Sequence, residues 1–195
     1  HLEKEKDPLG YCRKMIQVFY KEMEINKDVI APARSYEDMI KNQKEGKMSA
    51  VLTIEEGAVC QGNIDILWEL YDLGARMMTL TWNFRNCLGW PNKREEGTGK
   101  WIPDTERGLT KKGIAIVEEM ESLGMIPDVS HLSDKGIWDV LAHTKKPFAA
   151  SHSNARAIAS HPRNLTDDMV KRISERGGVI GINYYSLFLR NWKKD

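Results

Sequence analysis

Residues 124–152 read GMIPDVSHLSDKGIWDVLAHTKKPFAASH, and this stretch decides the fold class. Its two apolar segments, 125–130 and 147–151, have the length and composition of short buried strands. Between them, Ser133 is a typical N-cap residue for a helix over 133–144. A strand, a helix and a second strand in succession predict two parallel strands that are joined by a right-handed crossover.

The same alternation extends along the chain in both directions. Further strands are expected at 49–55, 77–81 and 178–183, and further helices at 35–44, 64–73, 110–122 and 166–176. This succession predicts an α/β fold that is either an open doubly wound sheet or a (β/α) barrel. No GxGxxG motif follows the first strand, which disfavours the open dinucleotide-binding form. Since a closed barrel of eight units takes about 250 residues, a barrel here is an incomplete one.

Two segments lie outside this alternation. The first 45 residues are charged and have helical spacing, so they are expected to form a helical lead-in. Residues 83–108 contain two tryptophans, two prolines and several glycines, and we expect a long loop without strands or helices. Long loops in compact domains are commonly lids or binding loops.

Composition excludes several classes of protein. Lysine plus arginine is 29 and aspartate plus glutamate is 28, so the formal charge of +1 argues against nucleic-acid binding. No apolar run reaches the roughly 18–20 residues that a membrane-spanning helix needs. Cys12, Cys60 and Cys87 lie far apart in the sequence and predict reduced thiols rather than disulfides or a cysteine zinc site. The sequence begins at His1, so the lack of a signal peptide says little, and a cytoplasmic location is the default expectation.

Chemistry in parallel α/β folds gathers where strands end. The residues at the predicted strand ends are Glu55, Trp82 with Asn83, His131, His152, and Asn183 with Tyr184 and Tyr185. Two imidazoles and a carboxylate suit zinc, whereas the alternative is that each histidine only hydrogen-bonds a neighbouring loop. Trp82 is expected to form a pocket wall.

The remaining basic residues allow simpler interpretations. His143 lies at a helix end, where a cation suits the helix dipole, and His161 precedes Pro162 in a loop that is expected to face solvent. His1 is terminal and carries no information. Arg163 is a candidate for bidentate binding of a substrate carboxylate, and the alternative is a surface salt bridge.

Five stretches together carry a resemblance to a known family. They are TIEEG at 53–57, LWELYDLGARMMTLTWN at 67–83, DVSHLS at 128–133, PFAASHSNARAIASHPRNLTDDMV at 147–170 and GGVIGINYY at 177–185. They resemble the membrane (renal) dipeptidases, which are zinc metallopeptidases with an amidohydrolase-like barrel. The resemblance covers residues 49–188, with 1–48 as lead-in, and implies that 1–195 form one partial barrel domain containing strands two to six of eight.

The resemblance also implies roles for individual residues. Glu55 corresponds to the carboxylate that bridges two zinc ions, and His131 and His152 correspond to ligands of one of them. Arg163 corresponds to the arginine that binds the C-terminal carboxylate of the substrate, and Asn183 and Trp82 line the substrate site. Trp82 stands where mammalian members have a histidine that steadies the oxyanion, so the oxyanion donor is unassigned.

Two expected elements of the family are missing from this sequence. It has no His-x-Asp motif, which supplies two ligands of the other zinc ion in the family. It also lacks the aspartate at the end of a late barrel strand that acts as general base. The intact family binds two zinc ions, and at most one has its full ligands here. We therefore expect a dipeptide-hydrolysing family member whose chain has little activity alone. The alternative is a non-catalytic fragment or pseudoenzyme that binds a peptide or partner. Open parallel sheet edges invite pairing, so a homodimer is also expected.

Overall fold

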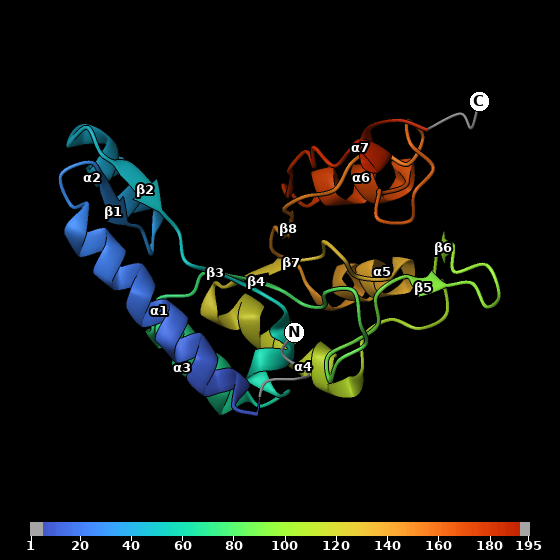
Figure 1. Ribbon diagram of the computed structural model, residues 1–195, viewed down its shortest axis with the longest axis horizontal. Coiled ribbons are helices and arrows are strands. Elements are labelled where there is room, and N and C mark those ends of the chain that lie inside the picture. Colours follow the sequence, from blue (N-terminus) through green and yellow to red (C-terminus); the bar gives the residue numbers. More distant parts are fainter. Residues whose placement is uncertain (1–5, 192–195) are drawn as a thin grey trace.

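The fold is built on a five-stranded parallel sheet, seen in a computed structural model that describes residues 6–191 (Figure 1). The strands are β3 (Thr53–Glu55), β4 (Met77–Thr79), β7 (Ile126–Asp128), β8 (Ala149–Ala150) and β9 (Val179–Ile180). Their order in the sheet follows their order in the chain, without reversal, and every neighbouring pair is parallel. A doubly wound sheet needs a reversal of strand order, so this topology is that of a (β/α) barrel segment.

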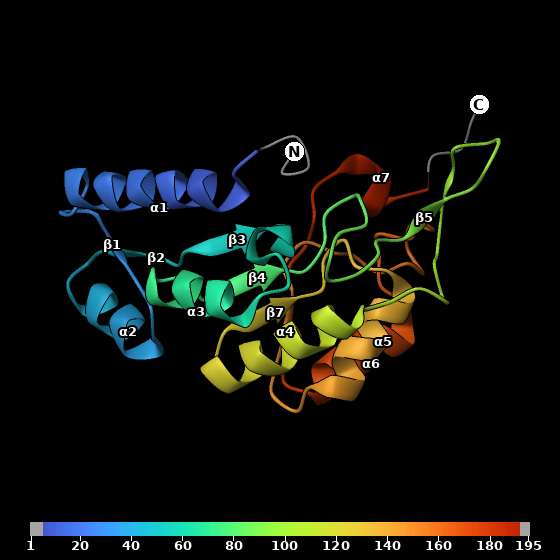
Figure 2. The same cartoon turned by 90° about the horizontal axis from the view of Figure 1, so that it is seen from below.

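Four helices cover one face of the sheet, as Figure 2 shows. They are α3 (Ile64–Asp72), α4 (Lys111–Leu123), α5 (Asp134–His143) and α6 (Asp167–Glu175), and each packs against the next in chain order. The side chains of Asn63, Thr110, Ser133 and Thr166 cap their N-termini by accepting backbone hydrogen bonds. Same-face helices follow from right-handed crossovers between strands that advance in one direction. The expectation of helices on the outer face is confirmed for these units.

Helix α1 (Pro8–Ile25) lies beside α3 and extends this outer layer. Arg13 Nε lies 2.6 Å from Glu69 Oε1, and Tyr20 donates a 2.8 Å hydrogen bond to the carbonyl of Leu73. Ile16 on α1 is buried and belongs to the main core. The core fills the space between sheet and helices, and its largest fully buried side chains include Leu67, Leu70, Met78, Leu80, Ile116, Met120, Phe148 and Ile173.

The lead-in differs from the sequence expectation, because it is not entirely helical. After α1 come β1 (Ile30–Pro32), α2 (Tyr36–Lys44) and β2 (Met48–Ala50), and β1 and β2 form a separate parallel pair. The strand expected over 49–55 is therefore divided between two sheets. The Ala50 carbonyl accepts from Ala33, whereas the Leu52 carbonyl accepts from Arg76, so the hydrogen-bonding partner changes at Val51.

The strands of the main sheet also end earlier than expected. They end at Thr79, Asp128, Ala150 and Ile180, rather than at 81, 130, 151 and 183. Two ladders stop for one physical reason: the backbone N–H groups of Ser130 and Ser151 donate to the Asp128 side chain instead of to a neighbouring strand.

Residues 83–108 are not free of secondary structure, which corrects another expectation. They contain β5 (Lys93–Arg94) and β6 (Trp101–Ile102), which pair antiparallel. Two-residue strands carry no period-2 signal, so local propensity does not reveal them. The 3₁₀ helix η2 (Gly57–Cys60) and the short helix α7 (Ser186–Leu189) were likewise not expected. Within residues 6–191, no helix combines the length and apolar character needed to cross a membrane.

Candidate metal centre

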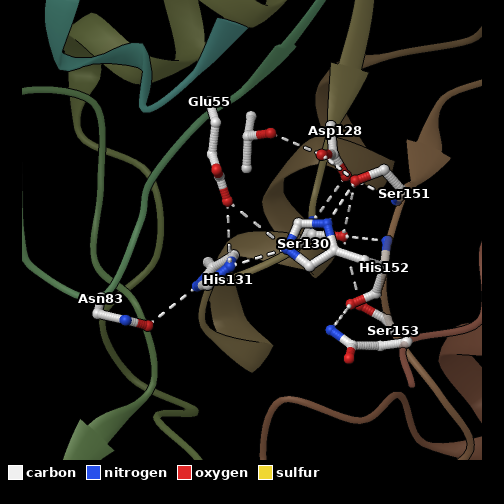
Figure 3. A network of polar contacts seen from close by, with 10 residues as sticks. Glu55, Asn83, Asp128, Ser130, His131, Ser151, His152 and Ser153 are labelled. Atoms are coloured by element: carbon white, nitrogen blue, oxygen red, sulfur yellow. Dashed lines mark hydrogen bonds and ion pairs between the residues drawn. The ribbon is translucent and has the colours of Figure 1, made fainter. Parts of the chain in front are cut away.

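Three ligand-type side chains meet at the carboxyl ends of β3, β7 and β8, and β4 lies between β3 and β7 in the sheet (Figure 3). Glu55 ends β3, His131 follows β7 and His152 follows β8, and one ligand atom from each lies within 4.8 Å of the others. The two Nε2 atoms are 2.8 Å apart, and Glu55 Oε1 lies 3.6 Å from His131 Nε2 and 3.8 Å from His152 Nε2. Side chains separated by 76 and 21 residues in the sequence thus point at one small volume.

The backbone around this cluster adopts an uncommon conformation. His131 has φ +71°, and Glu56, next to Glu55, has φ +90°. Positive φ in residues other than glycine costs free energy and concentrates at functional sites, where the surrounding structure maintains it. The short strands and these two residues together direct Glu55 and His131 toward each other.

His131 is oriented by Asn83 on the opposite side of its ring. Its Nδ1 lies 3.0 Å from Asn83 Oδ1, and an amide oxygen can only accept a hydrogen bond. Nδ1 therefore carries the proton, and the lone pair on Nε2 faces the cluster. With His152 in the same form, the two Nε2 lone pairs face each other across 2.8 Å, an arrangement that suits a bound cation rather than a hydrogen bond between the rings. The Trp82 ring lies beside that of His131, with 6.2 Å between the ring centroids, and its role as a pocket wall stays a prediction.

His152 is oriented by Ser151, which in turn contacts a buried carboxylate. His152 Nδ1 lies 2.7 Å from Ser151 Oγ, and Ser151 Oγ lies 2.6 Å from Asp128 Oδ2. Asp128 is fully buried and also accepts a hydrogen bond from the Thr79 hydroxyl at 2.6 Å. Figure 3 shows Ser151 and Asp128 on the side of the His152 ring that is turned away from His131.

Electrostatics favour the neutral form of both imidazoles. Burial, and after it the nearby charges of Arg163 and His152, lower the pKa of His131 to about 2. The pKa of His152 is also lowered, first by burial and then by Arg163, against the opposing effects of Asp128 and Glu55. Neutral imidazole is the form that binds a metal ion.

Arg163 lies close to this cluster and is buried, with 9% of its surface exposed. Burial lowers its pKa to about 10, while Asp128 and Glu55 favour its charged form. Its guanidinium carbon is 5.5 Å from the centroid of the Phe188 ring. Among residues 6–191, its side chain makes neither a hydrogen bond nor an ion pair, so the alternative of a surface salt bridge is wrong.

The Asn183 side chain contacts the site through hydrogen bonds to backbone groups. Its Nδ2 donates a 3.4 Å hydrogen bond to the carbonyl of His152, and its Oδ1 accepts one from the Tyr185 backbone at 2.8 Å. The side chain thus joins the end of β9 to the His152 loop, and its role in substrate binding stays a prediction.

The other histidines lie away from the cluster. His161 does not face solvent as expected, because its ring lies 4.6 Å from that of Phe188 and its Nδ1 accepts from the Arg163 backbone. His143 pairs with Glu118 at 2.9 Å at the end of α5, which agrees with a structural role. His1 lies outside the described residues. Cys60 is buried, which raises the pKa of its thiol to about 12 and opposes a nucleophilic role.

Sequence reasoning missed the residues that support the two histidines. The sequence prediction names Asn83 only as a strand-end residue, and it gives no supporting role to Asp128 or to Ser151. The available signals were a serine immediately before each histidine and an aspartate three residues before His131.

Comparison with protein families places these residues in context. The model of the family described as "Membrane dipeptidase (Peptidase family M19)" matches residues 4–194. The chain is 33% identical over 182 residues to an uncharacterized protein in the pqqA 5′ region of Klebsiella pneumoniae, covering 90% of this chain and 66% of that protein. It is 36% identical over 148 residues to the uncharacterized dipeptidase C965.12 of Schizosaccharomyces pombe, covering 76% and 34%. The chain thus spans less than two thirds of these relatives.

Solved structures give the same result. A metallopeptidase from Rhodobacter sphaeroides, liganded with a phosphinate mimic of L-Ala-D-Ala, is 29% identical with a TM-score of 0.79, over 89% of this chain and 48% of that one. The probable dipeptidase PvdM from Pseudomonas aeruginosa is 26% identical with a TM-score of 0.79, over 90% and 44%. The fold is accordingly part of a TIM-barrel-like metallohydrolase fold, and the chain belongs to the membrane dipeptidase family, peptidase family M19.

Proposed function

We propose that this chain forms the Glu–His–His side of a zinc-dependent dipeptidase site. The observation that carries the proposal is the convergence of Glu55, His131 and His152 within 4.8 Å, beside a buried arginine whose guanidinium makes no hydrogen bond or ion pair among residues 6–191. Membership of the family supports the reaction class.

The donor set fits a metal ion. Two neutral imidazoles and a carboxylate are ligands that zinc prefers, and three protein ligands with an open position are typical of catalytic zinc. The same nitrogen and oxygen donors also accept cobalt or manganese. Both histidines use Nδ1 for a hydrogen bond, which leaves each Nε2 for the metal, as metal-binding histidines do.

The residues of this chain have distinct parts in the proposed reaction. When bound, zinc lowers the pKa of a coordinated water to about 7, which supplies a nucleophile at neutral pH. The Glu55 side chain is 57% exposed and lies at the open side of the cluster. Its carboxylate is therefore able to bind a metal ion and to contact solvent at the same time. Arg163 binds the free carboxylate of the dipeptide through a bidentate pair of hydrogen bonds. Trp82 covers one side of the site and excludes water.

A second candidate function is zinc or peptide binding without turnover. It is favoured by the absence of a His-x-Asp motif from the sequence. A second metal clamps both the attacking and the leaving oxygen, and a general base contributes about 10²–10⁴ in rate. We therefore expect slow hydrolysis by this chain alone.

Zinc binding and dipeptide hydrolysis, measured on the same samples, test both functions. We expect one zinc per chain, measured by metal analysis and chelator competition, which is lost in His131→Ala and retained in the matched control His143→Ala. A chain that binds no zinc contradicts the proposal. Zinc binding without hydrolysis of Ala-containing dipeptides favours the binding function, whereas hydrolysis that disappears in His131→Ala shows that the residues present suffice.

A further inference from the structure

We infer that Asp128 and Ser151 form a hydrogen-bond relay that holds the proton of His152 on Nδ1. The relay makes them positioning residues for the proposed metal ligand, and the inference rests on the proposed function in that respect. Neither residue contacts the position that a metal ion or substrate would occupy, because both lie behind the His152 ring (Figure 3).

The relay begins at a carboxylate that is surrounded by donors. Asp128 Oδ1 accepts from the backbone N–H groups of Ser130 at 3.0 Å and Ser151 at 2.9 Å. Asp128 Oδ2 accepts from the hydroxyls of Thr79 and Ser151, both at 2.6 Å. A buried carboxylate with four donors has a fixed orientation, and each of its oxygens can only accept.

The direction of the relay follows from the single proton of the Ser151 hydroxyl. Three acceptors compete for it: Asp128 Oδ2 at 2.6 Å, the neutral His152 Nδ1 at 2.7 Å and Ser130 Oγ at 3.4 Å. The shorter bond to a carboxylate is charge-assisted and roughly twice as strong as a neutral one, so the proton points to Asp128. Ser151 Oγ can then only accept from His152 Nδ1 at 2.7 Å, which places the imidazole proton there and the lone pair on Nε2.

The two histidines of the cluster are therefore supported differently. His131 donates to the neutral amide oxygen of Asn83, whereas His152 donates to a hydroxyl that is polarised by a carboxylate. Hydrogen-bonded chains strengthen one another cooperatively in a low-dielectric interior. We expect His152 to be the more firmly fixed of the two imidazoles.

An Asp128→Asn substitution is a sharp test because it reverses the relay. The two backbone N–H groups at the Oδ1 position require the amide oxygen of asparagine to lie there. The NH₂ group must then face Ser151 and Thr79, and it donates to the Ser151 hydroxyl instead of accepting from it. Of the two acceptors that remain for the Ser151 proton, His152 Nδ1 at 2.7 Å is much nearer than Ser130 Oγ at 3.4 Å, so Ser151 donates to Nδ1. This moves the imidazole proton to Nε2 and opposes metal binding.

The primary measurement is the ¹⁵N NMR spectrum of the histidine side chains in the metal-free chain. We expect His152 to be protonated on Nδ1 in the wild type and on Nε2 in Asp128→Asn. The zinc dissociation constant should rise about 10–100-fold, the usual effect of losing an outer partner of a ligating histidine. Adding Ser151→Ala to Asp128→Asn removes the reversed donor, so the double variant should bind zinc more tightly than Asp128→Asn alone.

Two further variants keep the inference falsifiable. Thr79→Val removes the other hydroxyl on Asp128 Oδ2 and should leave the His152 tautomer unchanged. If Asp128→Asn does not fold, Ser151→Ala alone should still produce a mixture of tautomers. Retention of the Nδ1–H form and of wild-type zinc affinity in both Asp128→Asn and Ser151→Ala overturns the relay. The His152 tautomer is measured without metal. Failure of the chain to bind zinc would therefore reject the proposed function without affecting the test of the relay.

Discussion

Replacing Arg156 by methionine should destabilise the protein strongly, because this arginine neutralises a buried carboxylate. Its Nη1 and Nη2 lie 2.7 and 2.8 Å from the two oxygens of Asp134, and the side chains are 17% and 7% exposed. The same guanidinium donates to the carbonyls of Asn164 at 2.8 Å and Pro162 at 3.0 Å, which flank Arg163. The pair therefore joins α5 to the loop that carries the proposed substrate-binding arginine.

The magnitude follows from the burial of this pair. Removing one partner of a buried ion pair costs about 3–5 kcal/mol, because the other charge is left uncompensated. Asp134 would retain only the 3.3 Å hydrogen bond from Asn92 among its side-chain contacts. For a chain of this size, each 1 kcal/mol lowers Tm by about 2–4 °C, so Arg156→Met should lower Tm by about 6–20 °C.

Thermal unfolding followed by circular dichroism measures the shift in Tm, and urea unfolding followed by tryptophan fluorescence measures the change in the free energy of unfolding. The matched control is Arg172→Met, because Arg172 pairs with Glu175 at 3.1 Å on the surface and should change the free energy of unfolding by less than about 1 kcal/mol. The double variant Asp134→Leu with Arg156→Met removes both charges and should be more stable than Arg156→Met alone. If Arg156→Met is as stable as Arg172→Met, the reasoning is refuted.

Four further outcomes are expected. His131→Ala should weaken zinc binding by more than the about 10–100-fold typical of an outer-partner loss, and isothermal titration with an unchanged dissociation constant would exclude it as a ligand. Burial, with the charges of Arg163 and Arg156, lowers the pKa of His161 from 6.5 to about 4, so the unfolded state binds more protons between these values. The free energy of unfolding should fall as pH drops from 6.5 to 4, and this slope should diminish in His161→Gln; an equal slope would show that other groups dominate. Gly113→Ala would place its Cβ 1.9 Å from the Leu88 carbonyl oxygen, so a cost of about 1–3 kcal/mol is expected in thermal unfolding, against no change for exposed Lys111→Ala. β3 and β9 each have one neighbour in the sheet of residues 6–191, so sedimentation should show self-association at rising concentration, and a monomer throughout would contradict this.

The local sequence determines the helices and strands of this protein and shows which strand ends carry the candidate functional residues. Ser133 and Thr166 predict helix starts because a hydroxyl caps backbone N–H groups only two or three residues away. Apolar runs separated by helices predict parallel strands, and the end of a strand is visible where polar residues follow it. Glu55, His131 and His152 could therefore be named as a set before their distances were known.

Tertiary structure decides what lies between those elements. The division of 48–55 between two sheets depends on whether Ala33 or Arg76 supplies the next hydrogen bond. The burial of Arg163 and the contact of Asn83 with His131 likewise join residues far apart in the chain. Asp128 is the clearest case. Its neighbours in the sequence predict only that it lies in a strand. In the folded chain, its carboxylate accepts the backbone hydrogen bonds of Ser130 and Ser151 and supports His152 through the Ser151 hydroxyl. Local propensity acts over a few residues, whereas the environment of a buried polar group is set by packing between distant segments, so only the folded chain shows it.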